Sequence, residues 1–201
     1  MRWTPLLLSG VLVGLLLWWH HDSTTAGPGV EVLQTCGLVL GVGTAFLLDD
    51  PARATTAAVP LPLSWRTALP VLVGLVLVGT LWAGVLAWAA ATSATGLPWA
   101  ELSLQALAWT ILVLAVAASA RRLGDLDEPG PGAAAATAVI ALLIHQLPGR
   151  FSLTGDPAAT ATVIRWAALL AVGTLGLVLA GRDPAAPRLA PARRGVPAVR
   201  G

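Results

Sequence analysis

The chain contains no lysine, little charge of either sign and a single cysteine. Lysine is required by the phosphate-gripping motif GxxxxGK[ST], so its absence excludes such an ATP-binding loop from these 201 residues. Charged residues make up only 11% of the sequence, against about 25% in soluble domains, whereas hydrophobic residues make up 56%. With Cys36 alone, no disulfide can form within the chain. This composition is typical of an integral membrane protein.

Six apolar stretches, each near the length of a membrane-crossing helix, fill most of the sequence. A helix rises about 1.5 Å per residue, so about 20 residues cross a hydrocarbon core of about 30 Å. We therefore expect one all-α domain, a bundle of six transmembrane helices over residues 1–181. The stretches cover residues 5–19, 30–48, 68–92, 102–120, 133–147 and 158–181, of which the first and fifth are short. A cleaved signal peptide is an alternative for the first.

The arginines predict how these helices are oriented. If all six stretches cross, ten of the 12 arginines lie on the side of the two termini, and only Arg150 lies in a loop on the opposite side. The positive-inside rule then places both termini in the cytoplasm of a multi-pass protein of the cell membrane. Residues 182–201 are rich in Pro, Ala and Arg and show no periodicity, which predicts a disordered basic tail on the cytoplasmic side.

The connection between the second and third stretches, residues 49–67, has features of its own. Asp50 followed by Pro51 marks a helix start, and Pro60 and Pro62 would end that helix after about two turns. The pattern predicts a short helix parallel to the membrane, on which a cytoplasmic partner docks. An ordinary interfacial loop is the alternative. The residues assigned to docking are Asp49, Asp50, Pro51, Arg53, Thr55, Thr56, Pro60 and Arg66.

This connection resembles a loop of small six-span, ABC-2-like permease subunits of ATP-binding-cassette (ABC) transporters of actinobacterial type. The resemblance rests on residues 46–52, on Thr55 or Thr56, on residues 60–62 and on Arg66. It implies a permease subunit, acting in export, that pairs with a copy of itself or with a second permease. It also implies a separate ATPase subunit that binds ATP and docks beneath residues 49–66. The alternatives are a membrane scaffold or anchor without transport, and a small membrane enzyme that holds a cofactor at its histidines.

A second set of polar residues falls in the outer half of the expected membrane domain. Charged side chains inside a membrane are costly and usually face the bundle or a water-filled cavity. One interpretation is a polar vestibule in which Arg165 pairs with Glu31 or Glu101. The other is separate roles, in which the glutamates stabilise helix starts and the arginine reaches the headgroups. The candidate cluster consists of Glu31, Gln34, Glu101, Gln105, His145 and Arg165.

The remaining residues predict neither a metal site nor a catalytic centre. His20 and His21 are adjacent, so on a helix they point about 100° apart, and no fourth ligand accompanies them and His145. No nucleophile–base spacing indicates an enzyme. We expect no metal and no cofactor in this chain and no nucleic-acid partner. The expected surroundings are the lipid bilayer and the ATPase subunit.

Overall fold

The computed structural model describes residues 3–21, 29–49, 63–92, 96–124, 128–146 and 159–181, and within these ranges all of its regular secondary structure is helical. The elements are α1 (Thr4–His21), α2 (Val30–Gly43), the 3₁₀ helix η1 (Thr44–Leu48), α4 (Leu63–Thr92), α5 (Trp99–Gly124), α6 (Gly130–His145) and α7 (Thr160–Gly181). The predicted all-α class is confirmed for this part of the chain. The predicted tail, residues 182–201, and most of the predicted docking segment lie outside it.

Four helical segments of the described chain are long and apolar enough to cross a membrane. They are Val30–Leu48, which combines α2 and η1, Val71–Thr92 in α4, Trp99–Leu123 in α5 and Thr160–Gly181, which is α7. The helices α1 and α6 are also apolar but shorter. The chain is therefore a membrane protein by the length and composition of these helices. The count of six crossings and the position of the termini stay predictions.

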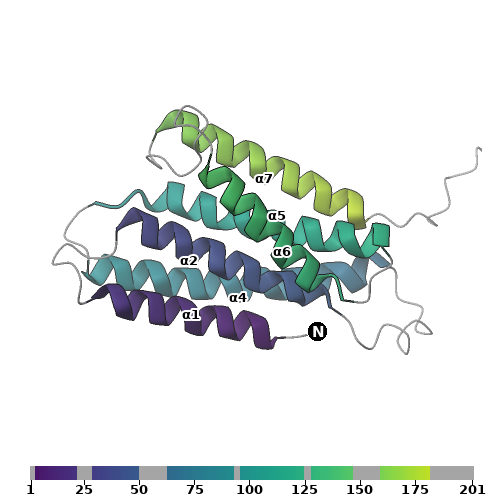
Figure 1. Ribbon diagram of the computed structural model, residues 1–201, viewed down its shortest axis with the longest axis horizontal. Coiled ribbons are helices and arrows are strands. Elements are labelled where there is room, and N and C mark those ends of the chain that lie inside the picture. The colour runs from purple at the N-terminus through teal and green to yellow at the C-terminus, as the bar shows by residue number, and fades with distance from the viewer. Residues whose placement is uncertain are drawn as a thin grey trace, which may run out of the picture.

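The helices lie lengthwise beside one another and alternate in direction, while α6 runs obliquely across its neighbours (Figure 1). As a result, α1 begins and α7 ends at the same end of the bundle (Figure 1). We call this the Asp49 end, because η1 leads into Asp49 there. The opposite end, at which α2 begins, is the Glu31 end.

The central helix of the bundle is α5, which packs against α2, α4, α6 and α7. Most side chains in its central stretch are buried, among them Val113 and Leu114, whereas α4 and α7 bury only a small share of theirs. Large apolar side chains on the outside of the bundle include Leu8, Val76 and Leu175. An apolar exterior of this extent suits lipid rather than water, in agreement with the membrane assignment.

Glycines allow α2 and α7 to approach α5 closely. A Cβ atom at Gly37 would lie 3.0 Å from the Cβ of Ala106, and a Cβ at Gly173 would lie 3.2 Å from Cγ2 of Ile111. Lipid supplies no hydrophobic driving force between helices, so membrane helices associate by such close backbone packing. The glycines thus position α2 and α7 around α5, and this arrangement shapes the site described next.

Candidate functional site

Asp49 fixes the start of α6. Its carboxylate is fully buried, and Oδ1 accepts a 2.8 Å hydrogen bond from the backbone N–H of Gly130, the first residue of α6. Pro129 and Pro131 have no N–H, so Gly130 carries one of the few donors that the first turn would leave unpaired. A Cβ at Gly130 would lie 2.7 Å from Oδ2 of Asp49, so glycine allows the carboxylate this approach. The helix dipole adds to the attraction.

Two arginines at the end of α5 bind the ends of neighbouring elements. Arg121 donates through Nη1 to the carbonyl of Leu48, 3.5 Å away at the end of η1. Arg122 donates through Nη1 to the carbonyl of Leu179, near the end of α7. Carbonyl groups at helix C-termini have no partner within the helix and carry partial negative charge, which favours arginine there. We call Asp49, Gly130 and the two arginines the Asp49 junction, because together they join η1, α5, α6 and α7.

Of the eight residues predicted to dock a partner, the described ranges include Asp49 and Arg66. Asp49 is buried and supports α6, and its contact with a docked partner stays a prediction. Of Arg66 the structure describes only the backbone, in the first turn of α4. The other predicted docking residues lie outside the described ranges: Asp50, Pro51, Arg53, Thr55, Thr56 and Pro60.

Toward the Glu31 end, four helices surround a cavity of about 570 Å³. Glu31 and Gln34 line it from α2 and Gln105 lines it from α5, so three members of the predicted polar cluster meet there. Trp109 of α5 and Trp166 of α7 also line it. The rest of the wall is Thr35, Leu38, Ala138, Ala141, Leu142 and Ile144. Small-molecule sites in proteins have volumes of about 300–1,000 Å³, which includes this cavity.

Two carboxamides in this wall have no protein partner for their nitrogen atoms. Gln105 is only 3% exposed, and Nε2 of Gln105 and Nε2 of Gln34 are both buried without a hydrogen bond to any described residue. The buried hydroxyl of Thr110, by contrast, donates to the carbonyl of Ala106 at 2.8 Å. An unpaired buried donor costs about 1–3 kcal/mol. Both side chains border the cavity although their nitrogen atoms are covered, and rotation of the terminal amide group would bring either donor to a bound molecule.

Two tryptophans form an aromatic wall beside these carboxamides. The ring centroids of Trp109 and Trp166 lie 5.5 Å apart with 64° between the ring planes, an edge-to-face pair. Both side chains are buried. Glu31 is exposed in the first turn of α2, so a carboxylate lies at the edge of the cavity while aromatic and amide groups lie deeper.

Glu101 and Arg165, which also belong to the predicted polar cluster, are not among the residues that line the cavity. Glu101 is half-buried in the first turn of α5. Arg165 is half-buried, and it follows the start of α7 at Thr160 by five residues, about 7.5 Å along the axis. It therefore lies closer to the helix start than a helix beginning at Pro157 would place it. Its pairing with a glutamate stays a prediction, and the side chain of His145 lies outside the described part.

The structure describes the side chains of Cys36 and His20 among the candidate metal ligands. Cys36 is fully buried in an apolar core with Leu33 and Leu40. Nδ1 of His20 donates to the carbonyl of Leu16, four residues earlier, at 2.9 Å. Within the described ranges no three His, Cys, Asp or Glu side chains gather closely enough to hold a metal ion.

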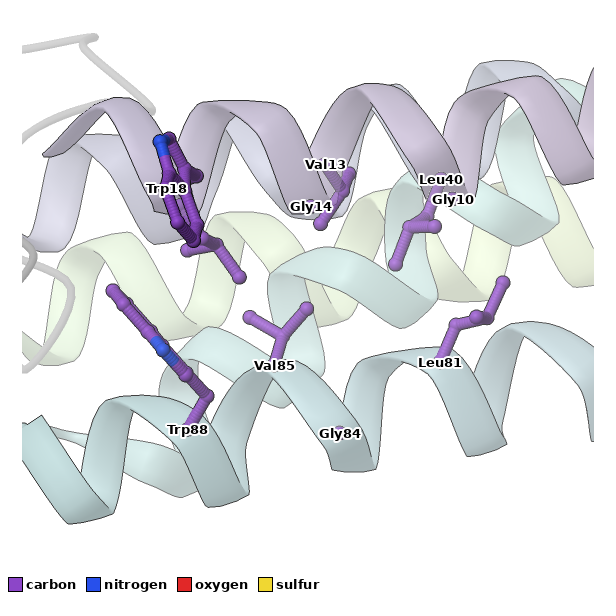
Figure 2. Close-up of a pocket in the computed structure, with 10 residues that line it drawn as sticks. Gly10, Val13, Gly14, Trp18, Leu40, Leu81, Gly84, Val85 and Trp88 are labelled. Carbon is purple, nitrogen blue, oxygen red and sulfur yellow. The ribbon is translucent and has the colours of Figure 1, made fainter. Parts of the chain in front are cut away.

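A second hollow, of about 400 Å³, lies between α1 and α4 and is shown in Figure 2. Gly10, Gly14 and Gly84 line it, and the rings of Trp18 and Trp88 lie near one another at one end (Figure 2). The remaining lining residues are Val13, Leu17, Leu40, Leu81 and Val85. None of the described residues that line this hollow is charged, so they offer little for recognition beyond apolar contact. The polar cavity is the better candidate site.

No protein-family model matches this chain, and no curated protein or solved structure is significantly similar to it. Its function has to be inferred from its own residues.

Proposed function

We propose that this chain is the membrane-spanning permease subunit of an ABC-type exporter driven by a separate ATPase. In this proposal all six helices cross the cell membrane, with the Asp49 end in the cytoplasm and the Glu31 end outside. The observation that supports transport most is the cavity containing the unpaired amides of Gln34 and Gln105. A scaffold or anchor gains nothing from unpaired donors inside its bundle, whereas a permease needs polar groups that exchange partners with a solute.

The Asp49 junction offers a route from the predicted docking segment to the cavity. Residue 50 follows Asp49 directly, and Asp49 is bonded to the first residue of α6. The second half of α6 supplies Ala138, Ala141 and Leu142 to the cavity wall. A force that an ATPase exerts on residues 50–62 would reach the start of α6 and tilt the helix at the cavity. Arg121 and Arg122 would carry the same displacement to α5 and α7.

ATP itself would be bound by the partner, since the chain has no lysine for a phosphate-gripping loop. The exposed apolar faces of α4 and α7 give a second permease, either another copy or a different chain, a surface on which to pack. This assembly of two permeases and an ATPase accounts for both the arginine-rich connections and the lack of any energy-coupling motif in this chain.

Co-purification together with ATP hydrolysis tests the proposal. The full chain, tagged and extracted from its native membrane in mild detergent, should bring with it a polypeptide that contains a phosphate-gripping loop. The purified complex should hydrolyse ATP. Mass spectrometry identifies the partner, and phosphate release measures the activity.

A loop variant and a matched control sharpen this test. Asp50→Lys with Pro51→Gly removes the predicted helix cap and first turn, and should leave the chain in the membrane without its ATPase. Gly14→Ala, in the apolar hollow between α1 and α4, should retain the ATPase in the wild-type amount. Recovery of the intact wild-type chain without any ATPase would contradict the proposal and favour a scaffold or anchor.

A further inference from the structure

We infer that the cavity between α2, α5, α6 and α7 binds an amphiphilic organic cation with a bulky apolar body and a carbonyl, ester or ether oxygen. The idea that this cation is the exported substrate rests on the proposed function. The binding itself does not, because every group that it uses belongs to this chain.

The interior of the cavity requires a hydrogen-bond acceptor. Nε2 of Gln34 and Nε2 of Gln105 are buried donors with no partner among the described residues, and both side chains line the cavity, so that rotation of either amide turns its donor toward a guest. A pure hydrocarbon guest would leave both donors unpaired in apolar surroundings, which is costly. A carbonyl, ester or ether oxygen placed between α2 and α5 would accept from one or both. The amides therefore select a guest that carries oxygen at its buried end.

The edge of the cavity favours positive charge. Among the described residues that line the cavity Glu31 alone is charged, and its side chain is exposed in the first turn of α2. A carboxylate at this point attracts a cation at the entrance and repels an anion. The two ends of the guest thus differ: the buried end carries an uncharged acceptor oxygen, and the end at the edge of the cavity carries a positive charge.

The side wall suits a large apolar or aromatic body. Trp109 and Trp166 are buried and set edge to face, and apolar residues of α6 pack against them and line the same cavity. Aromatic rings stack on indoles, and delocalised cations are attracted to the indole face. With a volume of about 570 Å³, the cavity accepts a drug-sized molecule.

Tetramethylrhodamine methyl ester is a probe with these features: it is an aromatic monocation with an ester carbonyl. Its fluorescence anisotropy is titrated with the purified full chain in detergent, and we expect saturable binding. Gln105→Leu and Glu31→Gln should each weaken it about tenfold, because each removes one hydrogen-bonding or charged partner. The matched control is Gln146→Leu, at an exposed amide beyond the end of α6, and should leave the affinity unchanged.

Two further arms complete the experiment. Sulforhodamine B, an anionic dye of related structure, should show no saturable binding to the wild-type chain. Added phosphatidylethanolamine, which carries both an ammonium group and ester carbonyls, identifies the natural source of the guest. Competition points to a lipid headgroup, and its absence points to a free cation.

Absence of saturable probe binding, unchanged affinity in both cavity variants, or equal binding of the anionic dye would overturn the inference. Gln105→Leu should stay folded, because an apolar replacement of an unpaired buried amide is neutral or stabilising, and a thermal melt checks this. No ATPase is present in the assay. A negative result here therefore leaves the transport proposal standing, and failed co-purification leaves the binding standing.

Discussion

Removing the carboxylate of Asp49 should destabilise the whole bundle, although this residue borders a segment predicted from the sequence to form a short docking helix at the membrane surface. In Asp49→Ala the buried N–H of Gly130 loses its acceptor at 2.8 Å. A hydrogen bond to a charged group contributes about 1.5–3 kcal/mol, and a carboxylate at a helix start adds about 0.3–1 kcal/mol. We therefore expect Asp49→Ala to lower the free energy of unfolding by about 2–4 kcal/mol.

Asp49→Asn separates the two contributions. The amide oxygen can still accept from Gly130, while the charge is lost, so the cost should be about half that of Asp49→Ala. The control is Glu31→Ala, which removes a carboxylate from the first turn of α2, where the side chain is exposed. Its cost should stay within about 0.3–1 kcal/mol. The expected order of stability is wild type and Glu31→Ala, then Asp49→Asn, then Asp49→Ala.

Thermal unfolding in detergent, followed by loss of helical circular dichroism, measures this order. For a chain of this size about 1 kcal/mol corresponds to about 2–4 °C, so Asp49→Ala should lower Tm by about 5–15 °C. If Asp49→Ala and Asp49→Asn both melt within about 1 °C of wild type, the hydrogen bond to Gly130 does not hold α6, and the coupling route through the Asp49 junction fails with it.

Three further predictions concern packing, topology and charge. Gly37→Ala should lower Tm, since overpacking costs about 1–3 kcal/mol. Gly14→Ala should leave Tm unchanged, because a Cβ there would have no atom within 4 Å, and equal Tm values for the two variants would refute the close packing of α2 on α5. A cysteine at Ser93 should react with a membrane-impermeant maleimide added outside intact cells, and one at Ala185 should not; the reverse pattern would invert the topology. Arg165→Leu should lower Tm more than Arg165→Lys if the arginine pairs with a glutamate, and a rise in Tm would show that it faces lipid.

The location of the helices could be predicted from the sequence because it depends on local features. Apolar runs bounded by Gly and Pro mark each helix, and α5 does begin directly after Pro98, with Glu101 in its first turn. The centre of the bundle could not be predicted, since α4 and α5 are both long and apolar. Whether a helix is buried depends on neighbours such as Gly37, which lets α2 approach α5, and this is a property of the packed bundle.

The candidate site was predictable only in part, for a related reason. Polar residues inside apolar stretches stand out, so Gln34 and Gln105 were recognised from the sequence, and the structure brings both to one cavity. Trp109 and Trp166 were missed because tryptophans in membrane helices are usual as packing residues. The bond from Asp49 to Gly130 spans 81 positions, and no local pattern at either residue indicates the other.

The shortness of α6 has a consequence for the membrane around the cavity. Its 16 residues extend for about 24 Å, less than a hydrocarbon core of about 30 Å. Because the start of α6 is fixed at the Asp49 junction, its other end does not reach the far side of the hydrocarbon core. The uncovered part of the core lies at the Glu31 end, beside Leu142 and Ile144 of the cavity wall. In the proposed six-span arrangement, this hydrophobic mismatch thins the outer leaflet locally and brings water to the cavity. Bilayer thickness then controls access: thick membranes cover the entrance, and thin ones leave it open.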